Sequence, residues 1–143
     1  MILLFLDFDG VLHPAQNNGR NNFCHLSLFE SVVRDFPEVS IVISSSWRLT
    51  YPLNELKAFF SNDIAARIIA ATGERNGMLR HVEISQYLEQ SGLKGTPWIV
   101  LDDNVFGFPA SWHNIIWCDG DIGLTPTIAD KLRQHLKKAQ LYS

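Results

Sequence analysis

The chain has 143 residues, of which 46% are hydrophobic, and its formal net charge is −3 at pH 7. This length and composition predict one globular domain over residues 1–143 and exclude a disordered chain. The small negative charge excludes a general attraction for nucleic acids or anionic membranes. No apolar run is long enough to cross a bilayer, and no signal-peptide pattern follows Met1, so we expect a cytoplasmic location.

The first predicted element is the apolar run Ile2 to Leu6, which is typical of a strand buried on both faces in a parallel sheet. Asp7 and Asp9 follow, one residue apart, and Gly10 lets the backbone turn away. Two such acids repel each other unless a cation or a proton lies between them. We interpret them as part of a hard-metal site in which one acid also does chemistry. The alternative is a solvated acidic turn.

Strands and helices then alternate along the chain. Further strands are predicted at Val39 to Ile43, around Arg67 to Ala70, at Trp98 to Leu101 and at Asn114 to Trp117. Helices are predicted after a capping box at Ser27 and Glu30, after Pro52 with Phe59 and Phe60 on its buried side, over Met78 to Gln90, and after the cap Thr125. The alternation predicts an α/β fold with a mostly parallel sheet.

Three of the predicted strands end in polar residues. The first ends at Asp7 and Asp9, the second in the run 44–46 of three serines, and the fourth at Asp102 and Asp103. Parallel strands bring their carboxyl ends to one edge of a sheet, so we expect these groups to converge. The acids could hold Mg²⁺, and a serine hydroxyl with nearby backbone N–H groups could hold a phosphate oxygen.

A phosphate site also needs a cation. Arg80, near the start of a predicted helix, is well placed in the sequence, and Lys94, in the loop before the fourth strand, is the alternative.

The order DFDGVL, a serine-rich second strand end, a basic residue and LDD resembles the haloacid dehalogenase (HAD) superfamily of phosphohydrolases. The resemblance covers nearly the whole chain. The motifs SSWR and RxxEI resemble a subgroup of small HAD proteins whose relatives occur as domains beside RNA-repair enzymes. The resemblance implies a Rossmann-like three-layer sandwich with a five-stranded sheet of order 3-2-1-4-5. The segments between the motifs are too short for a sizeable cap domain.

The resemblance also implies roles for single residues. Asp7 would be the nucleophile that becomes an aspartyl-phosphate, and Asp9 the general acid and then the base. Ser45, or else Ser44, would hold the phosphoryl group. Arg80 would neutralise its charge, although such families more often carry Lys there.

The metal would be Mg²⁺. The resemblance implies that Asp7, Asp9, Asp102 and Asp103 hold it, with the backbone carbonyl of Phe8.

Other polar and aromatic residues near these motifs have plainer interpretations. Trp47 is expected to pack rather than to stack on a substrate, and His13 to be a bystander. Arg48 could reach a substrate or pair with an acid. Asp119 and Asp121 are expected to form a turn.

The resulting hypothesis is a Mg²⁺-dependent phosphatase with an aspartyl-phosphate intermediate. Its open site favours a large or end-phosphorylated substrate, such as a nucleic-acid end. The alternative is a regulatory module that binds phosphate and metal with little turnover. A receiver-like signalling domain is disfavoured, because receivers carry the phosphate-accepting Asp after the third strand and residues 68–73 contain none.

Overall fold

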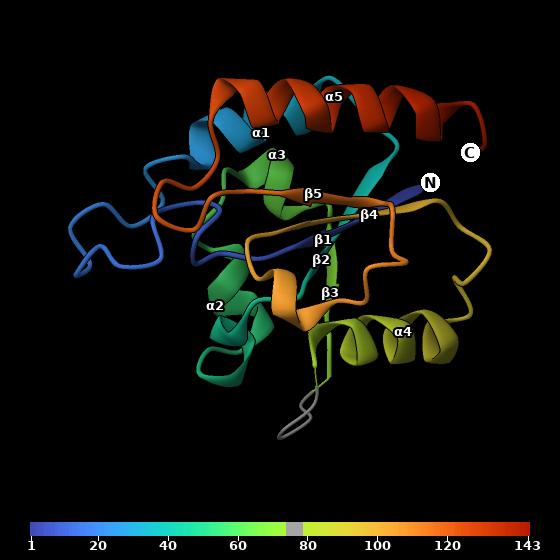
Figure 1. Cartoon of the computed structure of the whole chain (residues 1–143), viewed down its shortest axis with the longest axis horizontal. Helices are drawn as coiled ribbons and strands as arrows, with labels where there is room; N and C mark the ends of the chain where they lie inside the picture. Colours follow the sequence, from blue (N-terminus) through green and yellow to red (C-terminus); the bar gives the residue numbers. More distant parts are fainter. Residues whose placement is uncertain (74–78) are drawn as a thin grey trace.

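The computed structural model describes residues 1–73 and 79–143. At its centre is one five-stranded sheet in the order β3-β2-β1-β4-β5, with every neighbouring pair parallel (Figure 1). The strands are β1 (Ile2–Leu6), β2 (Val39–Ile43), β3 (Ile68–Ala71), β4 (Trp98–Asp102) and β5 (Ile115–Trp117). The predicted Rossmann-like α/β fold and its strand order are confirmed.

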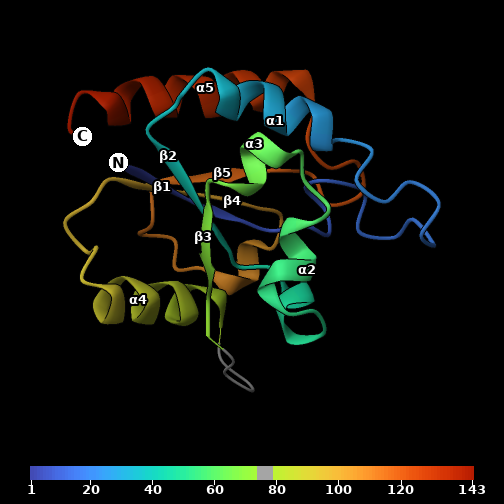
Figure 2. The same ribbon diagram turned by 180° about the vertical axis from the view of Figure 1, so that it is seen from behind.

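Helices cover both faces of this sheet. The α-helices are α1 (Leu26–Arg34), α2 (Leu53–Lys57), α3 (Asn62–Ala65), α4 (Arg80–Ser91) and α5 (Pro126–Gln140), and the short 3-10 helices are η1 (Ser46–Leu49) and η2 (Val105–Gly107). The pair α1 and α5 lies on one face and α4 on the other, as Figures 1 and 2 both show. Within the described residues, no helix has the length and apolar character needed to cross a membrane.

The central strand β1 is apolar throughout because both of its faces are covered. Its even-numbered residues, Ile2, Leu4 and Leu6, belong to the core cluster under α1 and α5. Leu3 and Phe5 belong to the second cluster, which includes side chains of α4. All five residues have an exposed fraction of 0%.

The register of the sheet aligns the polar strand ends. Leu6 of β1 pairs with Ile43 of β2 on one side and with Leu101 of β4 on the other. The next residue along each strand is Asp7, Ser44 or Asp102, so these three side chains begin at the same edge of the sheet.

The predicted capping box is wrong. His25 is the residue before α1, and its side chain makes no capping hydrogen bond to that helix. The Glu30 carboxylate instead accepts hydrogen bonds from the backbone N–H and the hydroxyl of Ser61, both at 2.8 Å. A tertiary contact to the start of α3 thus competes successfully with the local cap.

The helix after Pro52 is shorter than predicted. Because α2 ends at Lys57, Phe59 and Phe60 lie in the following turn, with Phe60 buried and Phe59 38% exposed. The prediction that both rings are buried is therefore wrong for Phe59. The cap on α5 is confirmed, since the Thr125 hydroxyl accepts a hydrogen bond from the Ile128 N–H. The predicted loop 74–77 and the predicted helix start at Met78 lie outside the described residues.

Candidate active site

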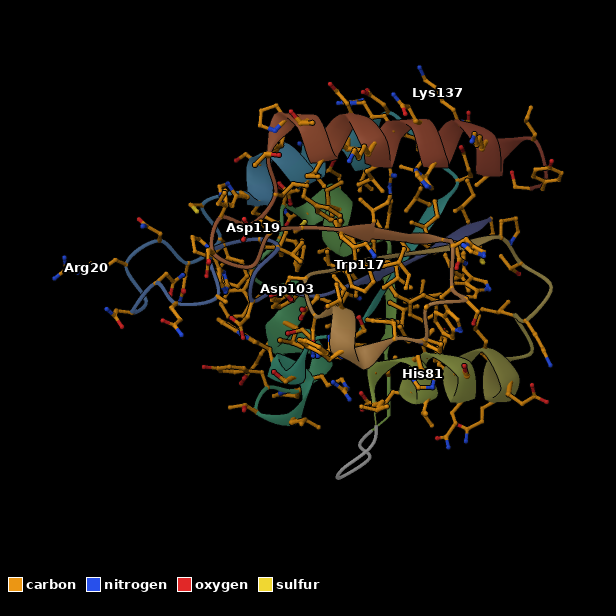
Figure 3. The ribbon with its side chains drawn as sticks, in the orientation of Figure 1. Arg20, His81, Asp103, Trp117, Asp119 and Lys137 are labelled. Atoms are coloured by element: carbon orange, nitrogen blue, oxygen red, sulfur yellow. The ribbon has the colours of Figure 1, made fainter. Side chains whose placement is uncertain are left out.

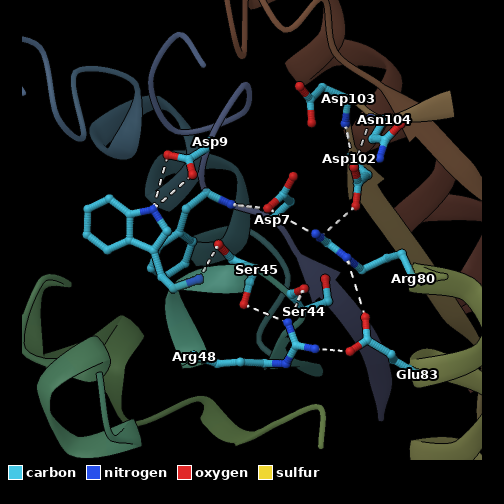
Figure 4. Close-up of polar contacts among 12 residues, drawn as sticks. Asp7, Asp9, Ser44, Ser45, Arg48, Arg80, Glu83, Asp102, Asp103 and Asn104 are labelled. Carbon is cyan, nitrogen blue, oxygen red and sulfur yellow. Dashed lines mark hydrogen bonds and ion pairs between the residues drawn. The ribbon is translucent and has the colours of Figure 1, made fainter. Parts of the chain in front are cut away.

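Three carboxylates meet at the carboxyl edge of β1 and β4. Each of Asp7, Asp102 and Asp103 offers an oxygen, and these atoms lie within 4.8 Å of one another. Asp7 is 5% exposed and Asp102 is fully buried. Oδ1 of Asp102 accepts hydrogen bonds from the N–H groups of Asp103 and Asn104, which fixes the turn after β4 (Figure 4). Asp103 and the loop that carries Arg20 lie toward the same end of the sheet (Figure 3).

The shifted pKa values of this cluster reflect its crowding. Burial, together with the charge of Asp7, raises the pKa of Asp102 to about 7, although Arg80 opposes the shift. The same two causes raise the pKa of Asp103 to about 6. Carboxylates are ligands of hard divalent cations, and a bound cation would relieve this repulsion. The donor set therefore fits Mg²⁺.

The crowding predicts how stability depends on pH. A raised pKa means that the folded protein binds more protons than the unfolded chain, so without metal the stability should fall as pH rises from about 4 to about 7. Millimolar Mg²⁺ should then raise Tm by several degrees at pH 8 and by much less at pH 5, where protons compete with the metal. Thermal unfolding in chelator, in Mg²⁺ and in NaCl of equal ionic strength measures these changes in Tm. An equal rise in Tm with Mg²⁺ at both pH values would contradict a metal site shared by these carboxylates.

Two glycines make room for the Asp103 carboxylate. A Cβ atom at Gly10 or at Gly120 would collide with Oδ2 of Asp103, and Gly10 also has a φ of +79°. The glycine of the DFDG motif is therefore required both by the turn and by the close approach of Asp103.

Arg80 is the cation that the structure places in this cluster. Its Nη1 lies 3.3 Å from Oδ1 of Asp7 and donates a hydrogen bond at 3.1 Å to Oδ2 of Asp102. Burial would lower its pKa, but the charges of Asp7 and Asp102 outweigh that effect and raise it. The Lys94 side chain is 77% exposed and forms an ion pair with Glu89. Because Lys94 precedes β4, it lies at the opposite edge of the sheet from the carboxylate cluster.

Both candidate serines are fully buried at the end of β2. The Ser45 hydroxyl accepts a hydrogen bond from the Trp47 N–H at 3.2 Å and so caps η1. The Ser44 hydroxyl has no hydrogen-bond partner among the described residues. An unpaired buried hydroxyl costs stability, which is a reason to expect a ligand oxygen near Ser44.

Asp9 lies apart from the group of three carboxylates. Its Oδ1 is 2.7 Å from Nε2 of His13, and both of its oxygens accept a hydrogen bond from Nε1 of Trp47 at 3.1 Å. Nδ1 of His13 accepts a hydrogen bond from the Phe23 N–H, so Nε2 carries the proton and donates it to Asp9. His13, which is 1% exposed, is thus not a bystander in this structure but orients Asp9.

Trp47 packs, as expected, against Phe8, with ring centroids 5.6 Å apart. The sequence does not predict the hydrogen bond from the Trp47 indole to Asp9. Asp119, labelled in Figure 3, precedes Gly120, which lies against Asp103. Its Oδ1 accepts the Asp121 N–H in a turn, as expected.

Arg48 pairs with an acid. Its side chain is 4% exposed, and its guanidinium forms an ion pair with Glu83 of α4. It also donates hydrogen bonds to the backbone carbonyls of Ser44, Ser45 and Thr72, which lie at the ends of β2 and β3. Arg48 therefore ties two strand ends to α4.

Glu83 links this arginine to the carboxylate cluster. Its other oxygen lies 3.9 Å from Nε of Arg80, one helical turn away. Burial raises the pKa of Glu83, and the charges of Arg48 and Arg80 oppose that shift. The RxxEI spacing places Arg80 and Glu83 on one helix face, which is the signal that could have revealed this contact.

The comparisons with known proteins agree with this geometry. A family model described as "HAD domain in Swiss Army Knife RNA repair proteins" matches residues 3–129. This range contains β1 from Leu3 onward, β2 to β5, and the site residues from Asp7 to Asp121. No curated protein and no solved structure matches the chain.

Proposed function

Since the chain belongs to the family of HAD domains found in Swiss Army Knife RNA repair proteins, we propose that it is a Mg²⁺-dependent phosphatase that uses Asp7 as its nucleophile. One observation carries the proposal. Asp7 lies in a buried cluster with two further carboxylates and with Arg80, at the sheet edge where α/β proteins bind ligands. Such a cluster can place a phosphoryl group between a nucleophile and a positive charge.

Asp7, Asp102 and Asp103 are the residues that would hold the metal, with the carbonyl of Phe8 as a further candidate from the family resemblance. When bound, Mg²⁺ supplies positive charge that stabilises the transferring phosphoryl group. Asp9 belongs to this set only by resemblance, because its carboxylate points to His13 and Trp47 instead.

Asp7 is held ready for attack by its neighbours. Its Oδ1 accepts a hydrogen bond from the Phe8 N–H at 2.8 Å and faces Arg80. In the first step an Asp7 oxygen bonds to phosphorus, the bond to the ester oxygen breaks, and Asp9 in its acid form gives a proton to the leaving oxygen. Water then attacks phosphorus and gives a proton to Asp9, while the bond between phosphorus and the Asp7 oxygen breaks. This step releases phosphate and restores the Asp7 carboxylate.

The remaining polar groups would bind the phosphoryl oxygens. Arg80 offers charge, and the Ser44 hydroxyl offers an unpaired donor. Ser45 retains its candidate role, because its hydroxyl can donate while it accepts from the Trp47 N–H.

A regulatory module with little turnover is the second candidate. The observation that favours it is the identity of Arg80, because an arginine stands here where such families more often carry Lys.

Phosphate release tests the proposal. The panel is an aryl phosphate, nucleotides, and oligonucleotides phosphorylated at the 5′ or the 3′ end, each with Mg²⁺ and with chelator. We expect release that requires Mg²⁺, and acid-quenched enzyme should carry phosphate on Asp7 when its peptides are analysed by mass spectrometry. Mg²⁺ binding without release from any substrate would favour the regulatory module.

A further inference from the structure

A small cavity opens beside Asp9. Its volume is about 290 Å³, and it is lined by Asp9, Ser46, Trp47, Thr50 and Tyr51. Pockets for small ligands begin at roughly 300 Å³, so this cavity suits one compact group.

Two of the lining rings, Trp47 and Tyr51, pack with Phe23 and Phe59 in a cluster that we call the aromatic ledge. Phe23 and Phe59 are stacked with centroids 4.6 Å apart, and Trp47 and Tyr51 are 5.6 Å apart and tilted by 31°. Tyr51 is 37% exposed and Phe59 is 38% exposed. The ledge therefore presents ring surface to solvent next to a carboxylate.

The ledge is joined to the phosphoryl site by a single turn of chain. Ser45 caps η1, and η1 carries Trp47. Trp47 donates its indole N–H to Asp9, the residue that protonates the leaving group in the proposed reaction. The leaving group must therefore lie against Asp9, at the mouth of this cavity.

We propose that the cavity and the aromatic ledge bind a nucleobase, namely the base of the nucleoside that carries the phosphate. This inference rests on the proposed phosphatase function. Bases of every kind stack on aromatic side chains, and the exposed rings here are Tyr51, which lines the cavity, and its neighbour Phe59. A nucleobase also has donors and acceptors along its edge, which the hydroxyls of Ser46, Thr50 and Tyr51 can pair with. The ring of a phosphotyrosine would leave these hydroxyls unmatched.

The test compares substrates with and without a base. Hydrolysis by wild type and by the variants Tyr51→Leu and Tyr51→Phe is measured on 3′- and 5′-mononucleotides, an end-phosphorylated oligonucleotide, a phosphotyrosine peptide and glycerol phosphate. Tyr51→Leu should lower kcat/KM for nucleotides about tenfold relative to glycerol phosphate, mainly through KM, because one stacking ring is lost. Tyr51→Phe should keep most of this preference. Mononucleotides and the oligonucleotide distinguish a free nucleotide from a strand end.

The matched control is Tyr142→Leu, which removes another exposed tyrosine, beyond α5, and should leave all rates unchanged. Equal losses on nucleotides and glycerol phosphate, or a larger loss on the phosphotyrosine peptide, would overturn the nucleobase proposal while leaving the phosphatase intact.

Binding tests the nucleobase site without turnover. Calorimetry with the Asp7→Asn variant should show a nucleotide affinity about tenfold weaker when Tyr51→Leu is added. That result would support the nucleobase site even if wild type released no phosphate. No effect of Tyr51→Leu on this affinity would overturn it.

Discussion

Asp7→Asn should lower phosphate release by about 10⁴-fold or more, because the amide cannot form the aspartyl-phosphate. The fold should survive this change. Asp7 is one of the charges that raise the pKa of Asp102 and Asp103, so its neutralisation relieves repulsion in the cluster. Arg80 keeps its hydrogen bond to Asp102. We therefore expect a Tm in chelator at or above that of wild type, with activity lost.

The matched control is Asp35→Asn, which neutralises an exposed aspartate paired with Arg133. This variant should retain full activity. If Asp7→Asn kept more than about 1% of the wild-type rate, Asp7 could not be the nucleophile. If it lost activity and Tm together, the loss would reflect unfolding and not chemistry.

Arg48→Met should destabilise the protein by about 3–5 kcal/mol, the usual cost of leaving one partner of a buried ion pair without the other. The side chains of Arg48 and Glu83 are 4% and 7% exposed, and several strand-end carbonyls lose their donor at the same time. Urea denaturation, followed by circular dichroism, measures the free energy of unfolding.

A double variant separates the ion pair from the carbonyl contacts. Adding Glu83→Leu to Arg48→Met should recover part of the lost stability, because no buried charge then lacks its partner. Lys94→Met, which breaks the exposed pair with Glu89, is the control and should change Tm little. A loss of stability in Arg48→Met as small as that in Lys94→Met would contradict a structural role for Arg48.

The sequence was most informative where one local pattern admits one structure. The apolar run from Ile2 to Leu6 has no polar face to offer to solvent, so it had to be a strand covered on both sides. The positions of Asp7, Asp102 and Arg80 followed from the rule that parallel strands deliver their ends to one edge, together with the family resemblance.

Contacts between distant parts of the chain could not be predicted. Glu30 binds Ser61 instead of capping its own helix, because a partner 31 residues away satisfies it better than its neighbours do. Asp9 pairs with Trp47 and Arg48 pairs with Glu83, and each pair joins two separate elements. The spacing of residues along the sequence does not predict such contacts. The exposure of Phe59 depended on where α2 ends, which is among the least certain features of any sequence-based prediction.

The position of β1 also bears on how the chain folds. Leu3 pairs with Ser40 on one side and with Trp98 on the other, so one edge of this wholly apolar strand stays open until β4 has been synthesised. Parallel pairing across such a long separation is slow, since the closure entropy of the intervening chain must be overcome first. A nascent or truncated chain that ends before β4 would expose unpaired backbone along its most hydrophobic segment, which is a template for aggregation. Refolding should accordingly regain helical signal well before it regains activity, and chaperones that bind extended apolar segments should recognise the residues around Phe5.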